Sequence, residues 1–138
     1  MLYPGEPINS PRVLARVGPR IAVGLHYAHE QAMQGREVPA FVADYLTPEY
    51  QRYLNARWDE MHATHSRVLH PGEEAFITPE AIRAMSLTGT RDEILERLAA
   101  LEAAGLTQFV ISPPRGYVEE SIVEFSQAIV KSYESATR

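Results

Sequence analysis

The sequence predicts a helix-rich α/β protein, and three observations lead to that prediction. Residues 107–112 (TQFVIS) are rich in Phe, Val and Ile and are followed by Pro113–Pro114, which is typical of a short β-strand. Residues 86–88 (SLT) form a second candidate strand. A helical pattern lies between them. Two parallel strands joined by a helix form a βαβ unit, and such a unit prefers to sit in a larger parallel sheet.

Helices are expected before this unit. Ser10 and Pro11 suit the start of a helix. The pair Gly18–Pro19 predicts an interruption, either a kink or a fresh helix start, because Pro lacks the N–H group that an unbroken helix needs. A second helix is expected over residues 19–34. Its buried stripe recurs at helical spacing and consists of Ile21, Leu25, Ala28 and Ala32.

Three further helix starts follow in the middle of the chain. A short helix is expected within residues 38–45, a long one from Pro48 to about Leu69, and another from Pro79 to Met85. In the last two cases a Thr precedes the Pro, which is a favourable combination for the first positions of a helix.

The C-terminal third carries the clearest helix signals. Thr90 and Glu93 match a capping box, in which each side chain satisfies the other's backbone N–H group. That helix is expected to end at Gly105 in a left-handed conformation. A last helix is expected over residues 118–133, with one apolar face formed by Val118, Ile122, Phe125 and Ile129.

Composition narrows the class of protein. The 138 residues are expected to form a single domain, 1–138, and the hydrophobic fraction of 45% fits a globular chain. Cysteine is absent, which excludes disulfides and thiol catalysis. The net charge of −5 without a basic cluster argues against nucleic acid as a partner. No long apolar run or charged leader is present, so we expect a cytoplasmic protein with no membrane partner.

Two stretches resemble one known family. They are SLTGTRDEILERLAALEAAGLTQFVISP (residues 86–113) and PGEPINSPRVLARVGPRIAVGLHYAHE (residues 4–30). Together they are similar to the C-terminal segment of the luciferase-like monooxygenases, which are FMN- or F420-dependent oxidoreductases. The resemblance implies part of a (β/α)₈ barrel of the TIM type, with a helical insertion. It also implies FMN or F420 as cofactor and a small-molecule substrate.

Length separates the chain from that family. A complete barrel takes about 250 residues and eight strands. The strands and catalytic residues that come earlier in the family have no counterpart here. The resemblance therefore implies an incomplete oxidoreductase, weak or inactive alone, that associates with a missing barrel half or with further copies of itself. No catalytic residue is assigned.

Four residues are candidates for cofactor binding. Thr88, Gly89 and Thr90 precede a helix N-terminus, where free N–H groups and the helix dipole favour a phosphate. Arg115 follows the last predicted strand and could hold a phosphate or carboxylate. The competing interpretations are an ordinary helix cap and an exposed Arg in a rigid turn.

Histidine and aromatic residues offer weaker alternatives. His26 and His29 are three residues apart, as are His62 and His65, so each pair shares a helix face on which a metal could bind. Buried, hydrogen-bonded histidines are the simpler interpretation, and no metal is assigned. Core or interface packing is likewise expected for an aromatic group formed by Tyr45, Tyr50, Tyr53 and Trp58.

A second function remains open from the sequence. The apolar helix stripes of the first two thirds also suit a non-catalytic helical module for binding or oligomerisation. Such a module would bury these stripes against a partner and would need no cofactor.

Overall fold

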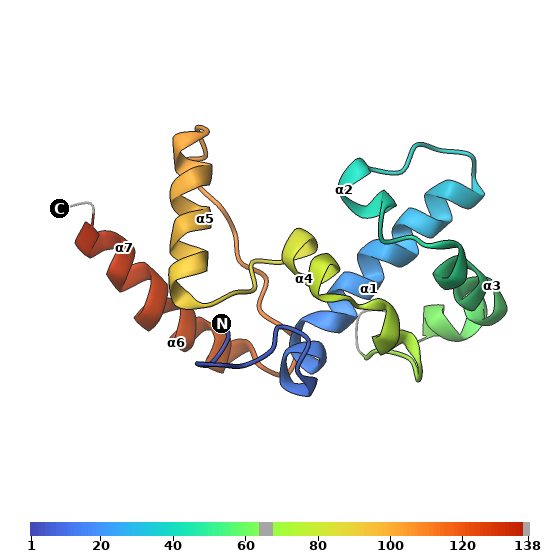
Figure 1. The fold of residues 1–138 in the computed structure, drawn as a ribbon, viewed down its shortest axis with the longest axis horizontal. Coiled ribbons are helices and arrows are strands. Elements are labelled where there is room, and N and C mark those ends of the chain that lie inside the picture. The colour runs from blue at the N-terminus through green and yellow to red at the C-terminus, as the bar shows by residue number, and fades with distance from the viewer. Residues whose placement is uncertain (64–67, 137–138) are drawn as a thin grey trace. The chain divides into compact units, whose positions relative to one another are not determined.

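Helices dominate the architecture that the computed structural model describes over residues 1–63 and 68–136 (Figure 1). In chain order they are α1 (Pro11–Met33), α2 (Ala40–Ala43), α3 (Pro48–Ala63), the 3₁₀ turn η1 (Glu73–Phe76), α4 (Pro79–Met85), α5 (Arg91–Ala103), α6 (Val118–Phe125), the π-helical turn η2 (Ser126–Val130) and α7 (Lys131–Ala136).

The chain divides into two compact units. A central unit spans residues 9–86, and a terminal unit combines residues 1–8 with residues 87–138. The single domain expected for 1–138 stays a prediction.

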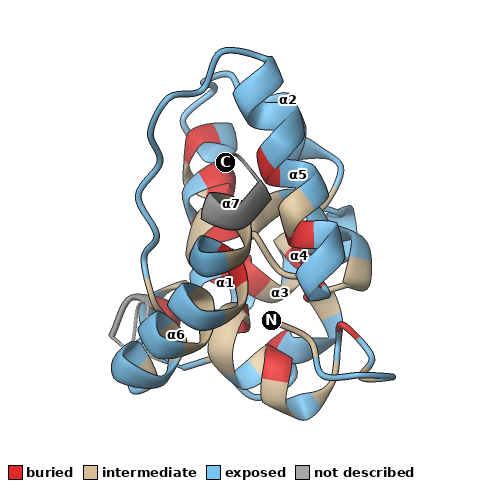
Figure 2. Ribbon diagram, turned by 90° about the vertical axis from the view of Figure 1, so that its left-hand side faces the viewer, coloured by how far each residue is buried: buried red, intermediate tan, exposed pale blue. Residues whose placement is uncertain are grey.

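The central unit packs α1 against α2, α3, η1 and α4. Apolar side chains of α1, α3 and α4 are buried together, and Figure 2 shows the buried positions along α1 and α4. The buried apolar residues of these three helices are Val13, Ile21, Ala22, Leu25, Ala28, Tyr50, Leu54, Met61, Ala81 and Ile82. The stripe predicted for this helix is confirmed as core at Ile21, Leu25 and Ala28, whereas Ala32, its fourth member, is exposed.

The predicted interruption at Gly18–Pro19 is wrong, because α1 continues through Pro19 as one helix of 23 residues. Pro19 removes only one helical hydrogen bond. Val13 before the Pro and Leu25 after it are both buried, so one continuous helix keeps both in the core. Gly18 is also buried against Leu69, since an added Cβ would lie 2.6 Å from Leu69 Cδ1. Tertiary packing therefore outweighs the local cost of the Pro.

The helices after α1 begin where the sequence predicts them. The Thr78 side chain accepts a hydrogen bond from the backbone N–H of Ala81 and caps α4. The helix predicted from Pro48 to about Leu69 leaves helical geometry at Arg57 (φ −134°, ψ 18°), and its described part ends at Ala63. The predicted C-terminal end falls partly on residues 64–67, which lie outside the described residues, and Val68 and Leu69 are not helical.

The terminal unit has a small core. Three buried residues, Ile94 and Leu98 of α5 and Ile129 of η2, form its centre, and partly buried side chains such as Phe125 pack against them. The Arg91 guanidinium joins the two helices, because it donates to the Ala128 carbonyl at 3.2 Å and to the Ser132 hydroxyl at 2.8 Å.

The α/β prediction, with its partial (β/α)₈ barrel, is wrong for the residues that the structure describes, none of which forms a β-strand. Residues 86–88 and 107–112 run without regular structure instead. A parallel strand pair needs neighbours on its edges and cover on both faces. Residues 1–63 and 68–136 supply no such neighbour. Residues 107–112 therefore form no strand despite their high β-propensity.

Across the described ranges, no helix is both long enough and apolar enough to cross a membrane.

The packing of α1 leads to a first prediction. Leu25→Ala removes a fully buried side chain and should lower the free energy of unfolding by about 2–5 kcal/mol. Met33→Ala, on the same helix but 61% exposed, is the control and should change it by less than about 0.5 kcal/mol. Trp58 is the single tryptophan, so its fluorescence during denaturation reports the central unit. Equal effects of the two variants would contradict the assigned core.

Candidate functional site

The three residues predicted to bind a cofactor phosphate lie at the start of α5. The Thr90 backbone N–H donates to Glu93 Oε2 at 2.7 Å, and the Thr90 hydroxyl accepts from the Glu93 N–H at 3.3 Å, which confirms the capping box. Gly89 is buried, and its carbonyl accepts a hydrogen bond from the Leu2 N–H at 2.8 Å. Thr88 is half-buried beside it.

These residues do not fit an anionic cofactor group. The Glu93 carboxylate already occupies the helix start where a phosphate would bind, and Asp92 adds a second negative charge in the same turn. Like charges at this distance repel. The geometry is that of a helix cap.

Arg115 lies apart from this helix start. It is exposed in the turn before Tyr117, where Gly116 takes a left-handed φ of 85°. Among the described residues we find no hydrogen bond or ion pair between Arg115 and Thr88, Gly89 or Thr90. The four predicted residues are therefore not brought together as one hydrogen-bonded site.

The histidines of α1 are buried and bind different partners. His29 Nε2 lies 2.8 Å from Asn55 Oδ1, and the His29 ring meets Trp58 edge-on. His65 and the side chain of His62 lie outside the described residues. Within the described ranges, no group of three or more His, Asp or Glu side chains is arranged to hold a metal ion.

A buried carboxylate, Glu73, joins three segments of the central unit. Its Oε1 lies 2.5 Å from His26 Nε2 of α1 and accepts a hydrogen bond from the Tyr50 hydroxyl of α3 at 2.7 Å. Its Oε2 accepts from the His70 backbone N–H at 3.1 Å. Glu73 and Tyr50 are fully buried and His26 is 3% exposed. A substrate has no access to this group, so its role is to hold α1, α3 and η1 together.

The environment stabilises the ionised form of this carboxylate. Burial raises the pKa of Glu73, but hydrogen bonds from His26, Tyr50 and the His70 amide, together with the charge of His26, outweigh burial and hold the pKa below its usual value. Burial and then the charge of Glu73 raise the pKa of Tyr50, so this phenol stays neutral and donates its proton.

Aromatic rings enclose the same carboxylate. Tyr50 stacks on Phe76 with ring centroids 4.6 Å apart and on Tyr53 at 6.1 Å. Arg57 lies over the Tyr53 ring, with 5.5 Å from its guanidinium carbon to the ring centroid. Core packing, which the sequence predicts for the aromatic group, is confirmed for Tyr50 and gives it no part in an open site.

Glu73 is absent from the sequence-based predictions. It sits in PGEEAF beside Glu74, which is exposed, and no local pattern distinguishes the two. The Pro71–Gly72 turn is a signal for a change of direction. The partners of Glu73 come from residues 23 and 47 positions away in the chain, which local sequence does not reveal.

The terminal unit presents an apolar surface. The apolar stripe predicted for the last helix is buried only at its C-terminal end, because Ile129 is buried while Val118 and Ile122 are about half exposed. Figure 2 shows α6 largely in the colour of exposed residues. Phe125 of this stripe meets Phe109 edge-on, at 6.1 Å between ring centroids. We define the apolar surface as Phe109, Val110, Ile111, Val118 and Ile122, which are 37–86% exposed.

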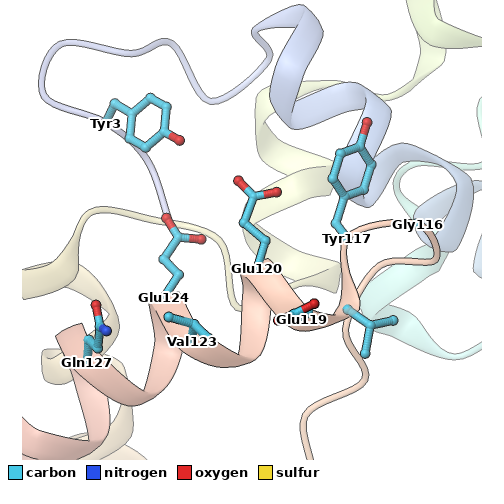
Figure 3. A pocket seen from close by; sticks show the side chains of 9 residues that line it. Tyr3, Gly116, Tyr117, Glu119, Glu120, Val123, Glu124 and Gln127 are labelled. Carbon is cyan, nitrogen blue, oxygen red and sulfur yellow. The ribbon is translucent and has the colours of Figure 1, made fainter.

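A hollow of about 650 Å³ adjoins α6 in the same unit. Figure 3 shows the side chains of Glu120 and Glu124 projecting from α6 toward the N-terminal segment that carries Tyr3. The N-terminal amine of Met1 lies 3.6 Å from Glu124 Oε2. The hollow is open, and its carboxylates make it unsuited to a phosphate.

No family model matches the sequence, and no solved structure matches the fold.

The Glu73 network leads to a second prediction. Glu73→Ala leaves the buried groups of His26 and Tyr50 without their acceptor and should cost about 3–5 kcal/mol of unfolding free energy at neutral pH. Glu74→Ala, at the exposed neighbour, is the control and should be near neutral. Trp58 fluorescence during urea denaturation measures both. A small loss for Glu73→Ala would show that the network adds little to stability.

Its pH dependence follows from the lowered pKa of Glu73. The unfolded chain binds a proton at this carboxyl near its ordinary pKa of 4.5, whereas the folded chain binds it only at lower pH. The stabilisation is therefore present above that value and is lost as the pH falls through the folded pKa. We expect the wild-type protein and Glu73→Ala to converge in stability as the pH is lowered below about 4.5. A constant difference over this range would contradict the assignment.

Proposed function

We propose that the protein is a non-catalytic interaction module that binds another protein through the apolar surface of its terminal unit. The observation that carries this proposal is the exposure of Phe109, Val110, Ile111, Val118 and Ile122 in a unit with a small core. Contiguous exposed apolar side chains mark binding surfaces in soluble proteins, because their burial against a partner is favourable.

The chemistry of the remaining groups supports the same proposal. The most polar cluster, around Glu73, is closed to solvent and satisfied by its own neighbours. The start of α5 is capped by Glu93 and does not offer an anion site. The cytoplasm, expected from the sequence, is the compartment that we propose.

The oxidoreductase function implied by the luciferase-like resemblance stays a prediction, and a titration tests it. We expect no saturable change in the fluorescence of FMN or F420 on addition of the protein, because Asp92 and Glu93 repel a phosphate at the start of α5. Glu93→Gln, which removes one of these charges, is the comparison variant. Saturable binding to the wild-type protein would favour the cofactor-dependent function.

Two substitutions on α6 test the interaction module. Val118 and Ile122 are four residues apart and lie on one helix face, so Val118→Gln with Ile122→Gln makes that face polar. We expect the wild-type protein to enhance the fluorescence of an apolar dye such as anilinonaphthalene sulfonate, and the double variant to lose most of that enhancement. Helix content by circular dichroism should be unchanged.

Stability separates a binding surface from a core. Because both side chains are about half exposed, the double variant should change the unfolding free energy by less than about 1 kcal/mol. Glu119→Gln, on the same turn of α6, is the matched control. A loss as large as that of a core substitution would show that this face belongs to the fold and would refute the proposed function.

A further inference from the structure

The extended segment of residues 107–112 has no backbone partner among the described residues. Figure 1 shows it as a long trace between α5 and α6. Within the described part of the chain, its N–H and C=O groups form no hydrogen bond. The hydrogen bonds nearest to it end at Leu106, whose N–H donates to the Leu101 carbonyl, and resume at Pro114, whose carbonyl accepts from Tyr117. A row of free donors and acceptors is the template on which another strand pairs.

The side chains of this segment are suited to a strand that is partly covered on one face. Val110 is 86% exposed, whereas Phe109 and Ile111, on either side of it, are 44% and 37% exposed. This alternation matches the period of two in which successive side chains of a strand point to opposite faces. Phe109 contacts Phe125, so the less exposed face rests on α6.

We propose that residues 107–112 pair with the same residues of a second copy of this chain to form an antiparallel two-stranded ladder. This inference rests on the proposed function, because it names the partner of the apolar surface. A β-branched and aromatic segment with unpaired backbone groups satisfies those groups most directly by adding a strand.

Charge favours a second copy as the occupant. The protein has a net charge of −5, so two copies repel each other over most of their surfaces. Residues 103–114 carry no ionisable side chain, and two copies can approach there without repulsion. Glu102 and Arg115 flank this neutral stretch. In an antiparallel pair the Glu102 end of one copy lies near the Arg115 end of the other, whereas a parallel pair would bring like charges together.

The prolines define the length of the ladder. When Val110 of one copy lies opposite Val110 of the other, Thr107 falls opposite Pro113. Pro113 and Pro114 have no N–H to donate, so pairing stops there. The arrangement has two-fold symmetry, in which each contact occurs twice, and it closes at two copies.

Sedimentation velocity and light scattering on the full chain, over a wide range of concentration, test this pairing. We expect a reversible monomer–dimer equilibrium. A protein that stays monomeric while still binding the apolar dye would overturn the second-copy inference and leave the proposed function standing. A mass that climbs beyond the dimer would overturn the closed pair.

A proline scan tests whether the backbone makes the contact. In a strand, the N–H groups of residues 108 and 110 point to one edge and those of residues 107 and 111 to the other. Gln108→Pro and Val110→Pro should therefore behave alike, and so should Thr107→Pro and Ile111→Pro. The pair on the contact edge should weaken dimerisation roughly thirtyfold, since each lost N–H removes two hydrogen bonds from the symmetric dimer. The other pair should stay near the wild type.

Val110→Thr is the matched control, because it keeps the N–H group and the β-branched shape while removing apolar character. It should dimerise within a few-fold of the wild type. Loss of the dimer in both proline pairs, or in neither, would overturn strand pairing. A dimer that Val118→Gln with Ile122→Gln abolishes but no proline affects would also overturn it, and would assign the contact to α6.

Discussion

Backbone hydrogen bonding is the constraint on which the rest of this structure depends. A helix satisfies its N–H and C=O groups within one segment, whereas a strand satisfies them only with a neighbour. The described residues of the central unit are mostly helical, and its helices meet this requirement within themselves. The terminal unit does not, because residues 107–112 are extended and have no neighbour among the described residues. Its incomplete pairing and its exposed apolar side chains occur at the same place.

The central unit shows how a buried polar group is satisfied. Glu73 is completely buried, yet both of its oxygens receive hydrogen bonds, from His26, Tyr50 and the His70 amide. A carboxylate without these donors would be driven toward its neutral form by desolvation. Because the donors come from α1, α3 and the turn before η1, the hydrogen-bonded carboxylate also fixes how these segments meet. Its burial and its complete satisfaction make it a structural group and not a reactive one.

Local signals in the sequence predict the helix boundaries well and the tertiary contacts poorly. The capping box of Thr90 and Glu93 and the left-handed Gly105 are confirmed, because each depends on residues within one turn. The break predicted at Pro19 fails because burial on both sides of it holds α1 together. The role of Glu73 is not predicted from the sequence, because its hydrogen-bond partners are distant along the chain. The strand at residues 107–112 has the right composition, but a strand is a property of two segments and not of one.

The contrast between the two units explains why the function should reside in the terminal one. Side chains that are buried and hydrogen-bonded within the unit, such as Glu73 and Tyr50, are not available to bind a partner. Val110 and its neighbours retain both apolar area and backbone donors, which are the two things that a protein partner can bury and pair. The absence of charge from residues 103–114 removes the main obstacle to close approach by another acidic chain. Residues 107–112 find no neighbouring strand within the described chain, which is why the α/β prediction fails. The same lack of a neighbour leaves this segment able to pair with another chain.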